Sequence, residues 1–306
     1  MSVLQAWGFP PAARCEPIVT RDGAPSVWLV EGSYYLKRDE KPSVIADLYT
    51  LSAHLARKGM PVAVPLLTRD GKPFTLYDGA AFFLRPRLEG DTLDDFDAID
   101  WNRMAFTVGA SAAWLHTAMA DCPPLRGVPR RNMLWRTENE SLPTLRAHGL
   151  LERLGLSEAA LSPWLRRLWG LYPALPRQLV HYDLHGNNML FRNGALCGVI
   201  DLDTCAYEAR LFDPLYFTGW LLWRMGGRTE GWARLVLRTL QGYASIAPLA
   251  RQEREAVPSM LLANHLYSAA VYLREGDEQR IARNAQMLRH VAYSLREIDA
   301  IFTSNA

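Results

Sequence analysis

The stretch from Leu179 to Asp213, LVHYDLHGNNMLFRNGALCGVIDLDTCAYEARLFD, constrains the fold of this chain more than any other. Two short apolar runs, Met189 to Phe191 and Leu196 to Ile200, are separated by the turn sequence Arg192-Asn193-Gly194. This pattern predicts a β-hairpin that carries acidic residues at its open end. Short apolar runs around a polar cluster are typical of loops that hold a metal ion and phosphate groups.

The polar residues of this stretch follow the spacing H-x-D-x-x-x-x-N, and a further Asp comes after the hairpin. Asp183 can accept or orient the proton of an attacking hydroxyl. Asn188 and Asp201 offer the hard oxygen ligands that suit Mg²⁺ bridging nucleotide phosphates. Asp203 is a direct metal ligand, a residue behind the ligands, or simply a hairpin residue, and the sequence leaves these alternatives open. The spacing predicts a phosphoryl-transfer loop.

The two histidines of the loop have another interpretation. His181 and His185 are four residues apart, the spacing of a zinc-binding helix. Gly186 and the polar run around it disfavour a helix here. We therefore expect His185 to orient the loop through hydrogen bonds.

The remainder of the chain divides into two parts of different character. Antiparallel strands are predicted from Glu16 to Lys37 and again from Phe74 to Leu84, with one helix from Ser43 to Lys58 between them. Residues 88–306 are mostly helical in pattern, with Ser162-Pro163 read as a helix cap and Pro258 as a helix break or start. The predicted class is α+β, with a domain boundary between residues 87 and 88.

Composition excludes several classes of protein. The 306 residues are 49% hydrophobic and carry a net charge of +2 with both signs interspersed, so we expect neither disorder nor general affinity for nucleic acid or membranes. Four scattered cysteines suggest free thiols in a reducing compartment. The N-terminal sequence does not resemble a signal peptide, and we expect a cytoplasmic protein. The oligomeric state is not predicted.

The sequences HYDLHGNNMLF and GVIDLD resemble the aminoglycoside phosphotransferase and choline kinase family, which includes homoserine kinase type II and fructosamine kinase relatives. The resemblance implies a bilobal protein-kinase-like fold, with a small antiparallel-sheet N-lobe containing one main helix and a larger, mostly helical C-lobe. Residues 1–87 would be the nucleotide-binding lobe, and residues 88–306 the lobe with the catalytic loop and the acceptor site.

The same resemblance implies a role for individual residues. Asp183 would be the catalytic base with His185 beside it, and Asp213 would brace the catalytic loop. Lys37 would hold the nucleotide phosphates and pair with an acid of the first helix, where Asp47 is the candidate. The other assigned residues are the metal ligands Asn188, Asp201 and Asp203, and the nucleotide-site residues Ser26, Leu84 and Arg85. A loop around Gly23 and Pro25 is a weak phosphate-loop candidate, with an ordinary hairpin turn as the alternative.

The sequence departs from the family pattern at three places. Tyr182 stands where the family usually has Gly, Gly186-Asn187 replaces a common Pro-Gly, and Asp47 is one methylene shorter than the usual Glu. None of these changes removes a group that the transfer requires.

The predicted function is an enzyme, an O-phosphotransferase that uses ATP and Mg²⁺, with GTP not excluded. The predicted acceptor is a hydroxyl of a small molecule, an aminoglycoside or another antibiotic-like compound, with drug resistance as one role. The alternatives are a homoserine or amino-alcohol kinase, a protein Ser/Thr kinase of the stress-response type, and a non-catalytic nucleotide-binding module of the spore-coat type. Two groups of residues are candidates for acceptor binding. The acids Asp91, Asp94, Asp95 and Asp97 could attract a cationic acceptor or form a solvated loop. The aromatic residues Tyr216, Trp220, Trp223 and Tyr267 could line a pocket or pack in the core.

Overall fold

The computed structural model describes residues 3–18 and 26–303, which form two compact units. The first, here called the sheet unit, comprises Met1–Thr92, Ala118–Pro129 and Asn188–Cys205. The second, the helical unit, comprises Leu93–Thr117, Arg130–Asn187 and Ala206–Ala306. The candidate phosphate loop around Gly23 and Pro25 lies outside the described residues.

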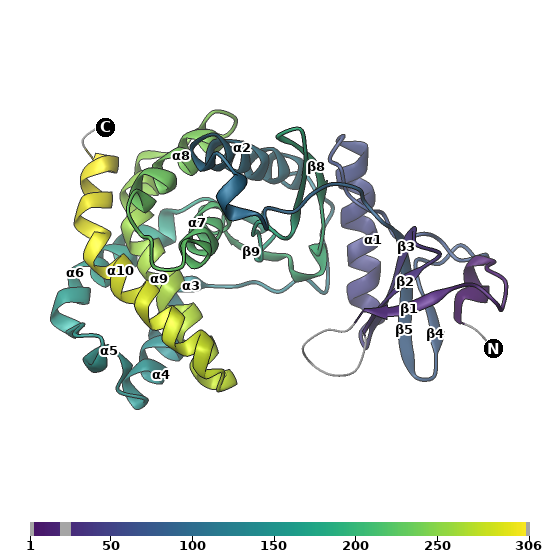
Figure 1. Ribbon diagram of the computed structural model, residues 1–306, viewed down its shortest axis with the longest axis horizontal. Helices are drawn as coiled ribbons and strands as arrows, with labels where there is room; N and C mark the ends of the chain where they lie inside the picture. The colour runs from purple at the N-terminus through teal and green to yellow at the C-terminus, as the bar shows by residue number, and fades with distance from the viewer. Residues whose placement is uncertain (1–2, 19–25, 304–306) are drawn as a thin grey trace. The chain divides into compact units, whose positions relative to one another are not determined.

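An antiparallel sheet in the order β1-β2-β3-β5-β4 organises the sheet unit (Figure 1). Its strands are β1 (Cys15–Ile18), β2 (Val27–Val30), β3 (Tyr34–Asp39), β4 (Thr75–Tyr77) and β5 (Ala80–Pro86), preceded by the 3₁₀ turn η1 (Val3–Trp7). Leu36 on β3 pairs with Leu84 on β5, and both are buried with Val30 in one hydrophobic cluster. Because side chains alternate along a strand, Lys37 and Arg85 lie on the opposite face.

Helix α1 (Pro42–Arg57) is the single long helix between the strands (Figure 1). Pro42 begins it, at a position where the missing N–H costs nothing. Its buried side chains recur at helical spacing, and Gly59 follows its end with φ +81°. The helix predicted from Ser43 to Lys58 is therefore confirmed.

The hairpin predicted in the opening stretch is also present. Strands β7 (Met189–Arg192) and β8 (Ala195–Val199) pair antiparallel around a two-residue turn. Asn193 and Gly194 have φ values of +53° and +77°, the left-handed conformation that such a turn demands. The amide of Ile200 donates to the carbonyl of Asn188 at 3.0 Å, so the residues that flank the hairpin meet at its open end.

The helical unit is built around long helices that bury one another. Its helices are most of α2 (Trp101–Met119), then α3 (Met133–Arg136), the π-helical turn η3 (Thr137–Ser141), α4 (Leu142–Ala147), α5 (Leu150–Arg153), α6 (Glu158–Leu171), α7 (Phe212–Met225), α8 (Trp232–Ala244), α9 (Arg251–Glu275) and α10 (Glu278–Thr303). Short elements complete the chain: η2 (Phe96–Ala98), η4 (Tyr172–Ala174) and the paired strands β6 (Arg177–Val180) and β9 (Ala206–Ala209) in this unit, and η5 (Leu202–Thr204) in the sheet unit. Helices α9 and α10 pack against each other as a helical hairpin (Figure 1). The expected α+β class, sheet-rich first and mostly helical afterwards, is confirmed.

Two prolines were assigned wrongly from the sequence. Helix α6 begins after Ser157, whose side chain accepts from the amide of Ala160, and Pro163 lies inside it rather than in its first turn. Helix α9 runs without interruption through Pro258. Each proline removes one backbone hydrogen bond, and the burial of α9 among its neighbouring helices outweighs that loss.

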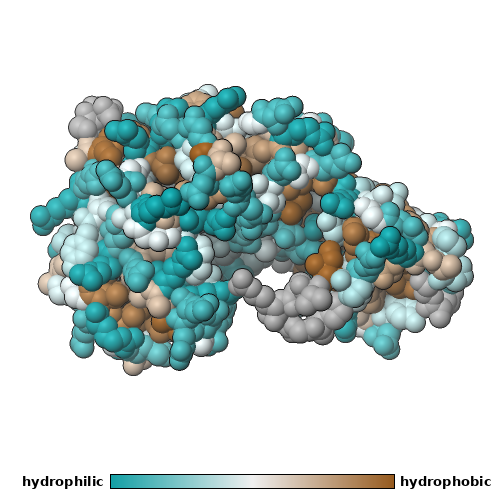
Figure 2. Space-filling view, viewed as in Figure 1, coloured by the Kyte–Doolittle hydropathy of each residue, from teal (hydrophilic) through white to brown (hydrophobic). Residues whose placement is uncertain are grey.

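The described surface carries scattered apolar side chains. Its exposed large hydrophobic residues include Leu76, Trp135, Trp169 and Tyr293. On the face of the helical unit seen in Figure 2, hydrophilic residues surround small separate hydrophobic areas. Within the described residues, we find no helix with the length and apolar content needed to cross a membrane.

Candidate functional site

The sheet unit holds two cations around one carboxylate. Lys37 Nζ donates to Asp201 Oδ1 at 2.9 Å, and Arg85 Nη2 donates to the same oxygen at 3.0 Å. Strand register explains the convergence, because Arg85 is opposite Tyr35, two residues before Lys37 on the same face. Lys37 also reaches Asp203 Oδ2 at 3.3 Å.

Asp201 lies in an uncommon backbone conformation. Its φ and ψ are +57° and +46°. This left-handed geometry is energetically unfavourable for any residue other than Gly. Burial alone would raise the pKa of its carboxyl group, but Lys37 and Arg85 outweigh burial and hold this pKa well below its usual range. Asp201 is therefore ionised at neutral pH and aimed at both cations.

The three expected metal ligands belong to the sheet unit. Asn188 precedes β7, and Asp201 and Asp203 follow β8 at the same end of the hairpin. Two carboxylates and one amide supply only hard oxygen donors, a set that fits Mg²⁺. Among the described residues, no cluster of three His, Cys, Asp or Glu side chains has a metal-binding arrangement, so the amide of Asn188 would have to complete the set.

Two expected nucleotide-site residues have other contacts. Asp47 accepts from the amides of Gly127 at 2.5 Å and Arg126 at 3.2 Å. In the part of the chain that the structure describes, the carboxylates bound to Lys37 are those of Asp201 and Asp203, so the expected Lys37–Asp47 pair is corrected. The shorter Asp side chain instead fixes α1 to the loop at Gly127.

Leu84 and Ser26, two other expected nucleotide-site residues, differ in burial. Leu84 is fully buried in the sheet core, where its side chain packs with Leu36 and Val30. Ser26 is exposed, and its carbonyl accepts from the amide of Arg38 at 2.9 Å. The side chain of Leu84 thus packs in the core of the sheet, while Arg85, the next residue, contacts Asp201 on the other face.

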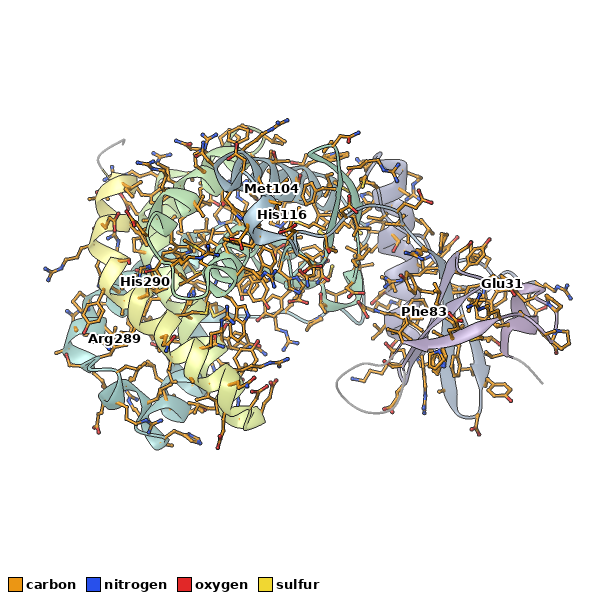
Figure 3. All side chains as sticks on the ribbon, viewed as in Figure 1. Glu31, Phe83, Met104, His116, Arg289 and His290 are labelled. Carbon is orange, nitrogen blue, oxygen red and sulfur yellow. The ribbon has the colours of Figure 1, made fainter. Side chains whose placement is uncertain are left out.

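In the helical unit, one buried carboxylate braces the candidate catalytic loop. Asp213 Oδ2 accepts from the amide of His181 at 2.7 Å, and Oδ1 accepts from the amide of Tyr182 at 2.9 Å. His116 Nε2 lies 2.8 Å from Asp213, and its Nδ1 lies 2.8 Å from the hydroxyl of Tyr243 (Figure 3 labels His116). Because a carboxylate only accepts, Nε2 carries the proton and Nδ1 accepts from Tyr243. Asp213 therefore has the bracing contacts that the family resemblance implies.

Asp183 is held by two neighbours of the helical unit. The hydroxyl of Tyr216 donates to its Oδ1 at 2.9 Å, and His185 Nε2 lies 3.6 Å from its Oδ2. The amide of Asn187 donates to His185 Nδ1, so the ring proton is on Nε2 and faces Asp183. Burial alone would raise the pKa of Asp183, but His185 and Tyr216 together lower it, and the carboxylate is kept ionised.

Tyr182 and Gly186 explain two departures from the family pattern. Tyr182 has φ +69°, the region in which Gly is favoured, and its ring stacks on Phe212 at 4.4 Å between centroids. A Cβ at Gly186 would lie 2.2 Å from the ring of Trp220, so only Gly fits there. The segment from His181 to His185 is not helical, which agrees with the rejection of a zinc-binding helix.

Several contacts were not predicted from the sequence. The sequence indicates Tyr216 only as an aromatic-pocket or core residue, whereas in the structure its hydroxyl donates to Asp183. The pairing of His116 with Tyr243 was missed entirely, because it joins residues 127 positions apart. A polar residue on a helix whose neighbours are apolar was the one available signal.

Three comparisons with known proteins show what the chain is similar to. A model of the phosphotransferase enzyme family matches residues 19–256. The homoserine kinase of Pseudomonas aeruginosa is 30% identical over 212 residues, which cover 68% of this chain and 62% of that protein. The chain thus matches somewhat under two thirds of the length of this curated relative.

Solved structures share the fold over nearly the whole chain. A microcompartment-associated aminopropanol kinase aligns with a TM-score of 0.71 at 18% identity, over 97% of both chains. An aminoglycoside phosphotransferase from Alicyclobacillus acidocaldarius aligns with a TM-score of 0.71 at 13% identity, over 99% of this chain and 95% of that one. These neighbours have protein-kinase-like folds, as the family resemblance implies. Because the family model spans most of the sequence, the chain belongs to the phosphotransferase enzyme family.

Proposed function

We propose that this protein transfers a phosphoryl group from ATP to a hydroxyl group of a small molecule, in a reaction that requires Mg²⁺. The observation that carries the proposal is the cluster of Lys37 and Arg85 around Asp201. Two cations and an ionised carboxylate are the groups needed to hold a triphosphate and its metal ion. Membership of the phosphotransferase enzyme family supports the same reaction.

On the donor side, Lys37 and Arg85 would bind phosphate oxygens. Asn188 and Asp201 would hold the metal ion, and Asp203 is a further candidate ligand. Bound Mg²⁺ would neutralise charge that builds up on the phosphates during transfer. Asp201 has a left-handed backbone, and its carboxylate accepts hydrogen bonds from both cations. These bonds fix the position of the carboxylate.

On the acceptor side, Asp183 would orient the hydroxyl and accept its proton as the bond to phosphorus forms. Its lowered pKa keeps the carboxylate in the accepting form at neutral pH. Tyr216 and His185 would hold the carboxylate in one orientation, and Asp213 would fix the backbone that carries it.

The acceptor is proposed as a class. Relatives named homoserine kinase and a fold neighbour named aminopropanol kinase both suggest a small hydroxylated amine or amino acid. The neighbour named aminoglycoside phosphotransferase supports an aminoglycoside. We therefore propose to test L-homoserine, amino alcohols and aminoglycosides together.

The test is ADP release with ATP or GTP, with and without Mg²⁺, across this acceptor panel. Asp183→Asn should lower kcat by about 10²–10⁴-fold while leaving nucleotide affinity nearly unchanged, because it removes only the proton acceptor. Asp70→Asn, in an exposed turn, is the matched control and should behave as wild type. Full turnover by Asp183→Asn with its best acceptor would refute the assigned role.

A second candidate, a nucleotide-binding module without turnover, is favoured by one observation. Asp47 binds Gly127 and does not supply the acid expected beside Lys37. Calorimetry with ATP and Mg²⁺ separates the two functions, since the module binds ATP without releasing ADP with any acceptor. Transfer of label to Ser or Thr of added protein would instead indicate a protein kinase.

A further inference from the structure

Two arginines of the helical unit lie over the ring of Tyr182, the residue next to Asp183. The guanidinium carbon of Arg131 is 5.6 Å from the ring centroid, and that of Arg136 is 6.0 Å away. Arg136 Nη1 also donates to the hydroxyl of Tyr182 at 2.8 Å and lies over the ring of Tyr267.

The segment that carries these arginines is firmly held. The amide of Met133 donates to Glu208 at 2.9 Å and to the hydroxyl of Tyr172 at 2.7 Å, and all these groups are buried. Asn132 caps α3 through the amide of Trp135 at 2.9 Å. The amide of Arg131 donates to the carbonyl of Tyr207 at 2.9 Å. The backbone that carries the two arginines is therefore held in place by the fold.

The described residues around the two arginines use only part of their capacity to donate hydrogen bonds. Arg131 Nε is buried and has no hydrogen-bond partner among the residues that the structure describes. Within the same described part of the chain, the one carboxylate paired with Arg136 is that of Glu140, 3.8 Å from its Nε. An unpaired buried donor is costly, so a site of this kind favours an anion that can accept two or more N–H groups.

The ring between the arginines and the loop links them to Asp183. Tyr182 stacks on Phe212, which stacks on Tyr216 at 5.5 Å, and Tyr216 donates to Asp183. Burial raises the pKa of Tyr182 above its usual range, so the ring stays neutral and cannot balance the arginines. The arginines, the aromatic residues and the proposed base form one continuous cluster in the helical unit.

We propose that Arg131 and Arg136 bind a carboxylate group of the acceptor, so that the preferred substrate is a hydroxy acid rather than a simple amino alcohol. The inference rests on the proposed function and defines the acceptor class for it. A guanidinium group matches a carboxylate through paired N–H donors, which a hydroxyl or an amine cannot replace. The acidic residues between Asp91 and Asp97 are a weaker candidate site for a cationic acceptor, because Asp97 already pairs with Arg228 at 2.9 Å.

Two matched pairs of compounds isolate the carboxylate. L-Homoserine and 3-aminopropan-1-ol differ only by this group, as do L-threonine and 1-aminopropan-2-ol. We expect kcat/KM for at least one of the acids to exceed that of its amino alcohol by tenfold or more in the wild-type protein. Arg131→Gln and Arg136→Gln should each raise KM for that acid at least tenfold, with little change for the amino alcohol.

Arg130→Gln is the matched control. Arg130 is an exposed neighbour that lies over Tyr207 and donates to no part of the Tyr182 cluster in the described contacts. Its loss should leave KM for the acid unchanged. If the arginines acted only through the positive charge of this region, KM for the acid would rise equally in all three variants. Unchanged amino-alcohol turnover also shows that the Gln variants are folded.

Calorimetric titration of the same four compounds separates this inference from the proposed function. Binding of the acid that weakens tenfold in Arg131→Gln, without ADP release from any acceptor, would support the carboxylate site and reject the kinase proposal. ADP release with equal kcat/KM for acid and amino alcohol in both pairs would support the kinase proposal and reject the carboxylate site. Failure of both acids to bind the wild-type protein would also overturn the carboxylate site.

Discussion

At the scale of single residues, two residues of the predicted site region have a left-handed backbone conformation. Tyr182 and Asp201 have φ values of +69° and +57°. Each carries a backbone cost of about 1–2 kcal/mol that its contacts must offset. At Tyr182 this cost is offset by ring stacking and by the hydrogen bond that its amide donates to Asp213, and at Asp201 it is offset by the contacts with two cations. The other residues with positive φ that are not Gly, Glu31, Asp78 and Asn193, lie elsewhere, and Asn193 has this conformation because a two-residue hairpin turn requires it.

Tyr216→Phe tests the hydrogen bond to Asp183. The bond helps to lower the pKa of Asp183, so its loss should raise that pKa. Because the ionised form accepts the proton, the acid limb of the kcat/KM profile should move to higher pH. Steady-state rates from pH 4 to pH 9 measure it. Tyr293→Phe, at an exposed position, is the control, and identical acid limbs would show that the bond does not tune the base.

Local sequence could predict part of the site. Asp183, Asn188 and Asp201 follow a short spacing, and the hairpin between them needs only neighbouring residues to form. Arg85 was assigned through the family resemblance, yet its bond to Asp201 joins residues 116 positions apart. The orientation of Asp47 toward Gly127 depends on a loop 80 residues away, which no spacing rule contains.

At the scale of elements, periodicity predicted where helices and strands lie, but not how proline behaves inside them. The strands and α1 were confirmed because alternation and helical spacing report directly on burial. Pro163 and Pro258 failed as boundary signals because packing of α6 and α9 outweighs one lost hydrogen bond each. Whether a helix continues through a proline depends on tertiary contacts, which cannot be read from a single sequence.

Helices α2 and α8 approach each other through two glycines. A Cβ at Gly109 would lie 1.8 Å from the carbonyl oxygen of Thr239, and one at Gly242 would lie 1.9 Å from that of Phe106. Because backbone is in the way, we expect Gly109→Ala and Gly242→Ala each to lower the free energy of unfolding by about 3 kcal/mol. Urea unfolding monitored by tryptophan fluorescence measures this loss.

Gly170→Ala is the control for these substitutions. Gly170 lies in α6, and a Cβ added there would meet open space, so the same change should stabilise the protein by about 0.5–1 kcal/mol. Wild-type stability in Gly109→Ala would mean that α2 and α8 are not in close contact.

At the scale of the whole molecule, a buried histidine of the helical unit should make stability depend on pH. His265 lies on α9, donates from Nδ1 to the carbonyl of Leu261 at 2.9 Å, and meets the edge of Trp232. Its Nε2 is buried and has no hydrogen-bond partner among the described residues. Burial lowers the pKa of His265 to about 4, and the nearby His290 has a lowered pKa for the same reason.

Stability should therefore fall on mild acidification. Between pH 6.5 and pH 4 the unfolded chain takes up a proton at residue 265 that the folded protein does not, so the free energy of unfolding decreases as pH decreases. The loss should reach about 3 kcal/mol at pH 4, at about 1.4 kcal/mol for each unit. Urea unfolding at half-unit steps of pH gives the slope. His265→Gln should remove most of this slope, with a remainder from His290, while His148→Gln, at an exposed helix end, should retain it. A His265→Gln slope equal to that of the wild type would place the pH dependence elsewhere.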